Sequence, residues 1–362
     1  METMTNTAEI LLDYLKKINK SFPGLFQDLD GYRKQHESSW PEYCYIPRFD
    51  IALFLKKNWK NKYENPKITV HDNNGAPIEC TYRAITALYN WRSHKKIYRF
   101  DPDLAKMLCD QADNSDPYKI ILPIEILRNL PFNGMYIDAD IGYAPCGEKY
   151  HGAFIYIDYM QGTPVFVITK TPRFVTGKHA VLSPFHDDLE LYEDKSVGEC
   201  IDITESNIAE SIEQDTFRQI SWFDTNKKEQ LYHDRKIQWR VINLFMYILA
   251  ANADIESSPE TRDTYRPRTD PDKPFKDAYR EIEQLNVGYR IGNTIRSSRG
   301  HNSTRATEEF KRIPHVRSGH WHRYWTGPRS SDSRTQIIKW IPPIFVNGYN
   351  ENFNVVSISP VE

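Results

Sequence analysis

Apolar residues recur at intervals of three and four positions through the first third of the chain. This spacing predicts amphipathic helices whose apolar faces lie over residues 10–18, 51–59, 84–91 and 102–109. The clearest helix start is at Asp101 and Pro102, because an aspartate cap followed by proline at the first helical position is a favoured beginning. We therefore expect residues 1–130 to form a helical N-terminal region.

After Pro131 the period of the apolar pattern changes from about 3.6 to two. Four short runs rich in Tyr, Ile, Val and Phe follow one another between Gly and Pro residues: MYIDADIGYA, GAFIYIDYM, TPVFVITK and KHAVLS. They predict an antiparallel meander over residues 133–183. The later stretch Val241–Ala253 is apolar nearly all round, which predicts a buried helix against that sheet. Residues 131–362 are thus expected to form the body of the protein.

The composition of the 362 residues is that of a globular protein. Hydrophobic residues make up 40% and aromatic residues 13%, which excludes a disordered chain or a coiled coil. Five widely spaced cysteines indicate neither a disulfide framework nor a paired metal site, and they favour a reducing cytoplasm. The start shows no secretion signal. The stretch Val241–Ala253 is interrupted by Asn243 and Asn252 and is too short to span a bilayer, so we expect no membrane anchor.

The formal net charge of −2 hides two segments of opposite sign. Residues 183–219 carry eleven acids and two cations, whereas residues 290–339 carry eleven cations and three acids. The segments either solvate opposite faces or pair with each other, or the basic one binds RNA or an acidic protein. Between them, residues 256–276 are rich in proline and charge, which predicts a mobile loop.

The densest chemistry lies in residues 314–327, PHVRSGHWHRYWTG. A turn at Thr326-Gly327-Pro328 and a returning run, QIIKWI, predict a β-hairpin followed by an extended tail. Alternation along the strand would place one set of side chains, His320, His322 and Tyr324, on one face, and a second set on the other: Arg317, Trp321, Arg323 and Trp325. The fold class is therefore α+β, with a helical N-terminal region, a mainly antiparallel sheet, a buried helix and a C-terminal β-hairpin.

Three chemistries remain open for this hairpin, beside a purely structural role in which the Trp face packs on the core. His320 and His322, with Arg317 or Arg323 on the phosphate, are candidates for metal-free RNA cleavage. The same imidazoles could hold a metal, but no third ligand is indicated, so we predict no metal site. Alternatively, the surface stacks bases or docks a peptide.

Two weaker patterns receive structural interpretations. Asp138, Asp140 and Asp158 fall on adjacent predicted strands, where acids could bind a divalent cation but are commoner as turn and edge residues. The glycines at 288 and 292 lack the preceding strand and third glycine of a nucleotide-binding loop. We therefore predict no cofactor.

Two C-terminal segments, PHVRSGHWHRYWTG and IIKWIPPIFVNG, resemble the signature of the type V-A anti-CRISPR family whose members down-regulate the messenger RNA of the type V-A CRISPR nuclease. A fainter resemblance covers LPIEILRNLPFNGMYIDAD and GAFIYIDY. The family is carried by phages and plasmids, so the resemblance implies a protein of the bacterial host cytoplasm.

The resemblance implies an interaction protein, although a ribonuclease stays open as the enzyme alternative. Its expected partner is the amino-terminal nascent peptide of a type V-A CRISPR nuclease or a related target, with the ribosome and the mRNA as further candidates and no membrane. Alternatives are a metal-free ribonuclease and a non-catalytic phage or plasmid accessory protein that binds nucleic acid. The candidate partner- or RNA-binding residues are His315, Arg317, His320, Trp321, His322, Arg323, Tyr324, Trp325 and Trp340.

Overall fold

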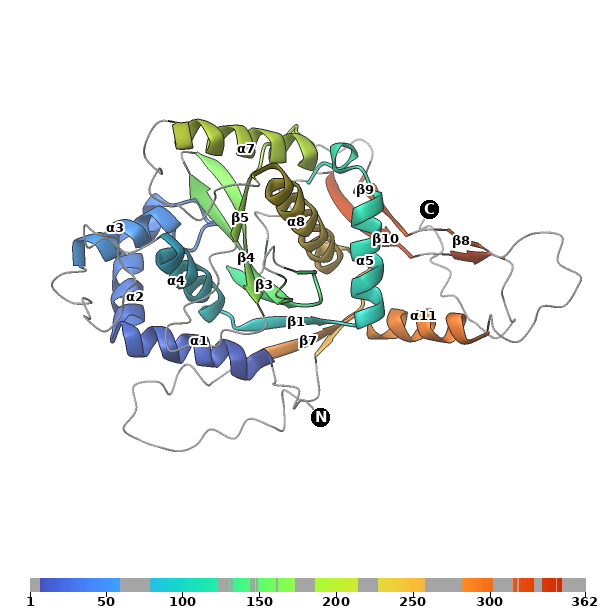
Figure 1. The fold of residues 1–362 in the computed structure, drawn as a ribbon, viewed down its shortest axis with the longest axis horizontal. Helices are drawn as coiled ribbons and strands as arrows, with labels where there is room; N and C mark the ends of the chain where they lie inside the picture. The colour runs from blue at the N-terminus through green and yellow to red at the C-terminus, as the bar shows by residue number, and fades with distance from the viewer. Residues whose placement is uncertain are drawn as a thin grey trace, which may run out of the picture.

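A mixed β-sheet lies between two layers of helices in the computed structural model (Figure 1). The structure describes residues 7–58, 79–122, 130, 133–143, 147, 149–160, 162–172, 186–213, 227–257, 282–301, 315–317, 319–328, 334–342 and 344–346. The N-terminal helices pack on one face of the sheet, and the helices of residues 102–114, 197–213 and 227–249 cover the other. Each face has its own apolar core, so the central strands are buried on both sides.

The N-terminal layer consists of four α-helices. These are α1 (Thr7–Ser21), α2 (Leu25–His36), α3 (Arg48–Asn58) and α4 (Glu79–Arg92), with a short 3₁₀ turn, η1 (Glu37–Ser39), after α2. The helices predicted from the apolar spacing at 10–18 and 84–91 are confirmed, and so is the one at 51–59 as far as Asn58, since Trp59 lies outside the described residues. Their apolar faces meet the sheet through Trp91, whose ring packs edge-on against Phe154 at a centroid distance of 5.9 Å.

The sheet has the strand order β5-β4-β3-β2-β1-β7-β6. Four strands form the predicted antiparallel meander: β2 (Gly134–Asp138), β3 (Tyr150–Met160), β4 (Thr163–Pro172) and β5 (His186–Glu190). The strand expected at KHAVLS, residues 178–183, lies outside the described residues. The mainly antiparallel character of the sheet is confirmed.

The centre of the sheet differs from the expected meander. β1 (Lys96–Phe100), from within the N-terminal region, pairs in parallel with both β2 and β7 (Glu283–Val287), and β6 (Ile255–Ser257) completes the edge. β1 has no strict alternation, because a central strand buried on both faces needs apolar residues toward each. The N-terminal region and the body therefore share one sheet.

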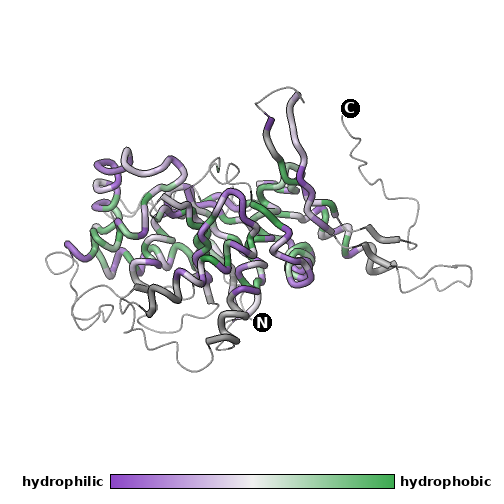
Figure 2. The backbone as a smooth tube through the Cα atoms, turned by 90° about the horizontal axis from the view of Figure 1, so that it is seen from above, coloured by the Kyte–Doolittle hydropathy of each residue, from purple (hydrophilic) through white to green (hydrophobic). Residues whose placement is uncertain are grey.

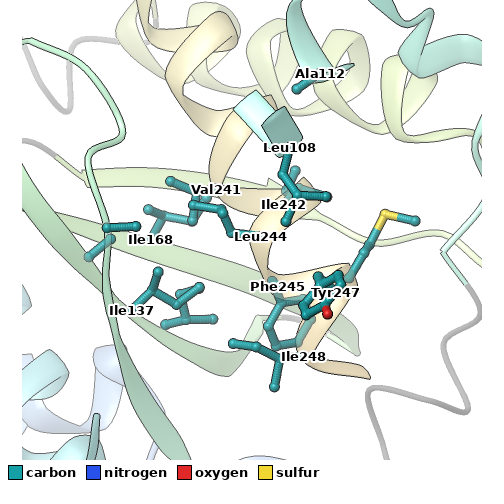
Figure 3. Close-up of a cluster of buried hydrophobic side chains, with 14 of the residues drawn as sticks. Leu108, Ala112, Ile137, Ile168, Val241, Ile242, Leu244, Phe245, Tyr247 and Ile248 are labelled. Carbon is teal, nitrogen blue, oxygen red and sulfur yellow. The ribbon is translucent and has the colours of Figure 1, made fainter. Parts of the chain in front are cut away.

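The second helical layer is built around α8 (Lys227–Leu249). The buried helix predicted at its C-terminal end is confirmed, with side chains from Val241 to Ile248 enclosed between the sheet and α5 (Pro102–Asn114) (Figure 3). Phe245 meets Phe166 of β4 at a ring-centroid distance of 4.8 Å. α7 (Val197–Glu213) lies on the same side of the sheet, and η3 (Pro117–Lys119) contacts it. Among the described residues, no helix is long and apolar enough to cross a membrane.

The predicted start of α5 is confirmed and also explains the glycine pair at 288 and 292. The Asp101 carboxylate accepts hydrogen bonds from the backbone N–H groups of Asp103 at 3.0 Å and Leu104 at 3.3 Å. α11 (Tyr289–His301) packs across this cap, and a Cβ at Gly292 would lie 2.0 Å from Asp101 Oδ1. Arg296 of α11 then donates to both Asp101 oxygens. A strand does precede Gly288, contrary to the sequence-based expectation, because residues 283–287 form a strand of the sheet. The two glycines nevertheless serve close packing, since a Cβ at either position would meet α5 or its cap.

Several of the described acids of residues 183–219 pair with cations of the body. Asp188 binds Arg48 in a bidentate manner at 2.7 and 2.8 Å, and Arg83 donates to it at 3.2 Å. Buried Lys170 pairs with Asp187 at 2.9 Å. These cations come from α3, α4 and β4, so Asp187 and Asp188 do not pair with the basic segment, contrary to the interpretation in which the two segments pair with each other.

The C-terminal part forms two small antiparallel pairs. β9 (His320–Thr326) pairs with β10 (Thr335–Ile341), which confirms the predicted hairpin. β8 (His315–Arg317) pairs with β11 (Ile344–Val346), so the segment expected as an extended tail returns beside the start of the motif. Figure 2 shows the β9–β10 hairpin extending away from the body.

Candidate partner-binding hairpin

Two tryptophans attach the β9–β10 hairpin to the helical layer. Trp340 and Trp321 are directly opposite each other in the ladder, so both side chains lie on one face. Trp340 is 1% exposed, donates from Nε1 to Gln111 Oε1 at 3.0 Å and packs edge-on against Tyr247 at 5.4 Å. Trp321 donates from Nε1 to Asn243 Oδ1 at 2.9 Å. This face anchors the hairpin.

The segment after α8 borders β10 on the side away from β9. The Asn252 side chain accepts from the Trp340 N–H at 3.0 Å and donates to the Trp340 carbonyl at 2.7 Å. The N–H of Ala251 donates to the Ile338 carbonyl at 2.9 Å. These bonds substitute for a third strand, because they satisfy backbone groups that would otherwise face an open edge.

The opposite face of the hairpin is open. His320, His322 and Tyr324 are exposed, and the His322 and Tyr324 rings lie 4.3 Å apart between centroids. Lys339 is directly opposite His322, and its Nζ lies 5.2 Å from the centre of the Tyr324 ring, within cation–π range. The outer face therefore presents imidazole, phenol and ammonium groups together.

Where the hairpin extends past the body, the face that carries Trp321 and Trp340 is exposed as well. Trp325 is 57% exposed, with the Arg334 guanidinium 5.2 Å from its ring centre, and Arg323 is exposed as well. β9 and β10 contain no acidic residue. Among the described residues, no carboxylate pairs with Arg323, Arg334 or Lys339, whereas Arg290 and Arg296 are both taken up by acids of the body. Among the cations of residues 290–339 whose side chains the structure describes, those of the hairpin are therefore the ones left available.

The structure separates the residues that the sequence motif groups together. The predicted alternation of His320, His322 and Tyr324 against Trp321, Arg323 and Trp325 is confirmed. Trp340 is buried, so its indole supports the surface without forming part of it. His315 and Arg317 lie on β8, a separate strand pair, and their side chains are outside the described residues.

The aspartates in β2, just after β2 and in β3 are held by groups of the protein. Asp138 accepts from the Thr7 hydroxyl at 2.8 Å, Asp158 accepts from the Arg48 N–H at 3.1 Å, and Asp140 pairs with Lys149 at 2.7 Å. Burial raises the pKa of Asp138 and Asp158, although Thr7 and Arg48 partly oppose the effect. Within the described part of the chain, no cluster of His, Cys, Asp and Glu could hold a metal ion.

Sequence reasoning did not identify Asn243, Asn252 and Gln111 as supports of the hairpin. A signal was present, because Asn243 and Asn252 interrupt a stretch that is otherwise apolar. A buried amide such as that of Asn243 needs hydrogen-bond partners, and the indole N–H of Trp321 is one, whereas Asn252 binds the backbone of Trp340.

Known proteins resemble this chain along most of its length. The sequence pattern of the AcrVA2-like family, described as an anti-CRISPR type V subtype A2 family, matches residues 98–348. Protein FinQ of Escherichia coli is 24% identical over 341 residues, which cover 88% of this chain and 94% of that protein. The crystal structure of AcrVA2 has the same fold, with a TM-score of 0.57 and 19% identity over 95% of this chain and 100% of that one. The match to the family includes the whole β9–β10 hairpin.

Proposed function

The chain belongs to the AcrVA2-like anti-CRISPR type V subtype A2 family, and from that premise we propose that it suppresses a CRISPR nuclease at the level of expression. In this proposal it recognises the amino-terminal peptide of a type V-A nuclease during translation, and the message being translated is then degraded. In this proposal the suppression takes place in the cytoplasm of a bacterial host, and the gene is of phage or plasmid origin.

The open face of the β9–β10 hairpin is the observation that carries this proposal. It combines exposed aromatic rings with cations that have no carboxylate partner among the described residues, and it lies within the family match. Aromatic and arginine side chains contribute most of the binding energy in many protein interfaces. A rigid attachment through Trp321 and Trp340 presents this surface with little conformational entropy left to lose on binding.

The proposal is tested by co-expressing the protein with a type V-A nuclease and measuring the nuclease transcript. Three reporters are compared: the native start, a start with synonymous codons, and a start recoded to a different peptide. Recognition of the peptide predicts transcript loss for the first two and a stable transcript for the third.

Each alternative gives a different pattern in the same experiment. Transcript loss that disappears with synonymous codons would indicate recognition of the RNA sequence. A transcript that stays stable with the native start would reject the proposal for this nuclease. A Tyr324→Ala and Trp325→Ala double variant serves as the matched inactive control, because both side chains are exposed and the anchoring tryptophans stay in place.

A ribonuclease is the second candidate function, because His320 and His322 occupy one open face with Lys339 beside them. One imidazole would act as base and the other as acid in cleavage by the adjacent 2′-hydroxyl. Purified protein incubated with the target RNA, without ribosomes or host extract, decides this question. Cleavage that is lost in both His320→Ala and His322→Ala would support it. Intact RNA would leave degradation to a host nuclease.

A further inference from the structure

We infer that β9 binds an extended peptide through its open backbone edge, so that the peptide adds a third strand to the hairpin beside Trp321, Arg323 and Trp325. This inference rests on the proposed function for the identity of the peptide. It assigns the binding to main-chain atoms at a defined edge, in addition to the exposed side chains.

The direction of the backbone groups on β9 follows from the bonds around Trp340. Both the N–H and the carbonyl of Trp340 bind Asn252, so neither points toward β9. Trp340 and Trp321 therefore form a non-hydrogen-bonded pair of the antiparallel ladder. In such a pair the backbone groups of both residues point away from the partner strand. Because a strand repeats every two residues, the backbone N–H and C=O groups of Arg323 and Trp325 point away from β10 as those of Trp321 do.

The second bond to β10 gives the same result independently. The Ile338 carbonyl accepts from Ala251 and also points away from β9, and Ile338 is the register partner of Arg323. The ladder bonds of β9 therefore come from His320, His322 and Tyr324, whose side chains form the open outer face.

The two edges of the hairpin differ in what borders them. The edge of β10 is covered by Ala251 and Asn252. No described residue donates to or accepts from the backbone of Trp321, Arg323 or Trp325. Such a row of free donors and acceptors is a template for an added strand, which is how several peptide-binding domains work.

The charge of the hairpin defines the chemistry of the peptide. An added strand would place one side chain directly opposite Arg323 and another beside the exposed ring of Trp325. Neither strand of the hairpin carries an acid, so an acidic residue opposite Arg323 and an apolar residue beside Trp325 are favoured. Nucleic acid could stack on the same rings, but it cannot satisfy alternating backbone donors and acceptors along a strand edge.

Arg323 offers a sharp test because its N–H points away from β10. Arg323→Pro removes this donor and the charge while leaving the β9–β10 ladder bonds in place, since proline is tolerated on the open side of an edge strand. Arg323→Ala is the matched control that removes only the side chain. We measure the affinity of the purified full chain for two fluorescent probes: the first fifteen residues of a type V-A nuclease, and a nine-residue peptide of alternating Glu and Val.

We expect Arg323→Ala to weaken binding several-fold and Arg323→Pro to weaken it at least ten-fold further. Amide hydrogen exchange at Arg323 and Trp325 should slow when the peptide binds, whereas exchange at His322 and Tyr324 should change little because those amides already bind β10. Equal affinities of the proline and alanine variants would overturn the inference. Displacement of the probe by an oligouridylate that binds both variants equally would also overturn the inference.

A second arm keeps the test decisive if Arg323→Pro does not fold. Two series of peptides, methylated on the odd or on the even backbone nitrogens, are tested for binding to the unaltered protein. Methylation of the nitrogens that face β9 should abolish binding, whereas methylation of the others should have little effect. Equal loss in both registers would contradict strand addition. If the Glu-Val peptide binds in a register-dependent manner and the nuclease peptide does not bind, the proposed target is rejected. Strand addition at the edge of β9 would then still be supported. Self-association that is lost in Arg323→Pro would instead assign the edge to a second copy of this chain and overturn the inference.

Discussion

Asn243, fully buried in the C-terminal part of α8, accepts a hydrogen bond from the indole Nε1 of Trp321 at 2.9 Å. The same amide donates from Nδ2 to the Trp239 carbonyl at 2.9 Å, so both ends of the side chain are used. A single buried polar residue therefore connects the main apolar helix to the strand that carries the candidate binding surface.

Breaking this connection should destabilise the hairpin. Asn243→Leu leaves the Trp321 N–H without a partner, and Trp321→Phe leaves the Asn243 oxygen without a donor. Each single variant should cost ~1 to 3 kcal/mol in the free energy of unfolding measured by urea denaturation. The double variant should cost less than the sum of the two, with a coupling of about 1 kcal/mol or more. Strict additivity would show that the two residues do not interact.

The close contact between α11 and the cap of α5 predicts a large effect of one methyl group. A Cβ at Gly292 would lie 2.0 Å from Asp101 Oδ1, so Gly292→Ala must displace the capping carboxylate or the helix. We expect a loss of roughly 2 to 4 kcal/mol in thermal or chemical unfolding. The matched control is Gly31→Ala in α2, where nothing lies within 4 Å. There alanine should stabilise by about 0.5 to 1 kcal/mol, since helix propensity is the only change.

Two carboxylates should respond to pH in opposite directions. Burial alone would raise the pKa of Asp113, but hydrogen bonds from Arg240 and Lys236 outweigh it and lower the pKa. Its contribution to stability is thus present above the pKa of the unfolded chain and is lost as the pH falls through the folded value. Asp113→Asn should destabilise the protein at pH 7 by ~1 kcal/mol and have no effect in strong acid.

Asp138 provides the opposite case, because burial raises its pKa. The folded state binds its proton more tightly than the unfolded state does, so stability falls as the pH rises toward the folded pKa. Asp138→Asn keeps an oxygen that can accept from Thr7 and removes this cost. The variant should gain stability relative to the parent between mildly acidic and neutral pH. A loss at neutral pH would show that the charge itself is stabilising.

Local rules were sufficient for most elements that build the fold. The start of α5 followed from Asp101 and Pro102, and the buried end of α8 followed from its apolar composition. The parallel placement of β1 was not predictable in this way, because strand pairing between Lys96–Phe100 and Glu283–Val287 depends on tertiary packing across 187 positions. Periodicity identifies a strand but does not identify its neighbours.

The candidate site was predictable in composition and only partly in arrangement. Period two gave the correct faces for His322 and Tyr324, but it could not show that the hairpin extends beyond the body. For that reason the sequence grouped buried Trp340 with exposed Trp325. The break between β8 and β9 also separates Arg317 from the strand on which it was placed.

The two tryptophans of different exposure allow anchoring and binding to be separated experimentally. Trp340→Ala removes a buried ring and its bond to Gln111, and it should cost about 3 to 5 kcal/mol of stability. Trp325→Ala changes a ring that is 57% exposed and should change the free energy of unfolding by at most ~0.5 kcal/mol. If the open hairpin binds the partner, Trp325→Ala should reduce transcript loss at least ten-fold at unchanged protein level, because one desolvated aromatic contact contributes about 2 kcal/mol to an interface. Quantitative immunoblotting beside transcript measurement checks this, and full activity of a folded Trp325→Ala variant would place the binding surface elsewhere.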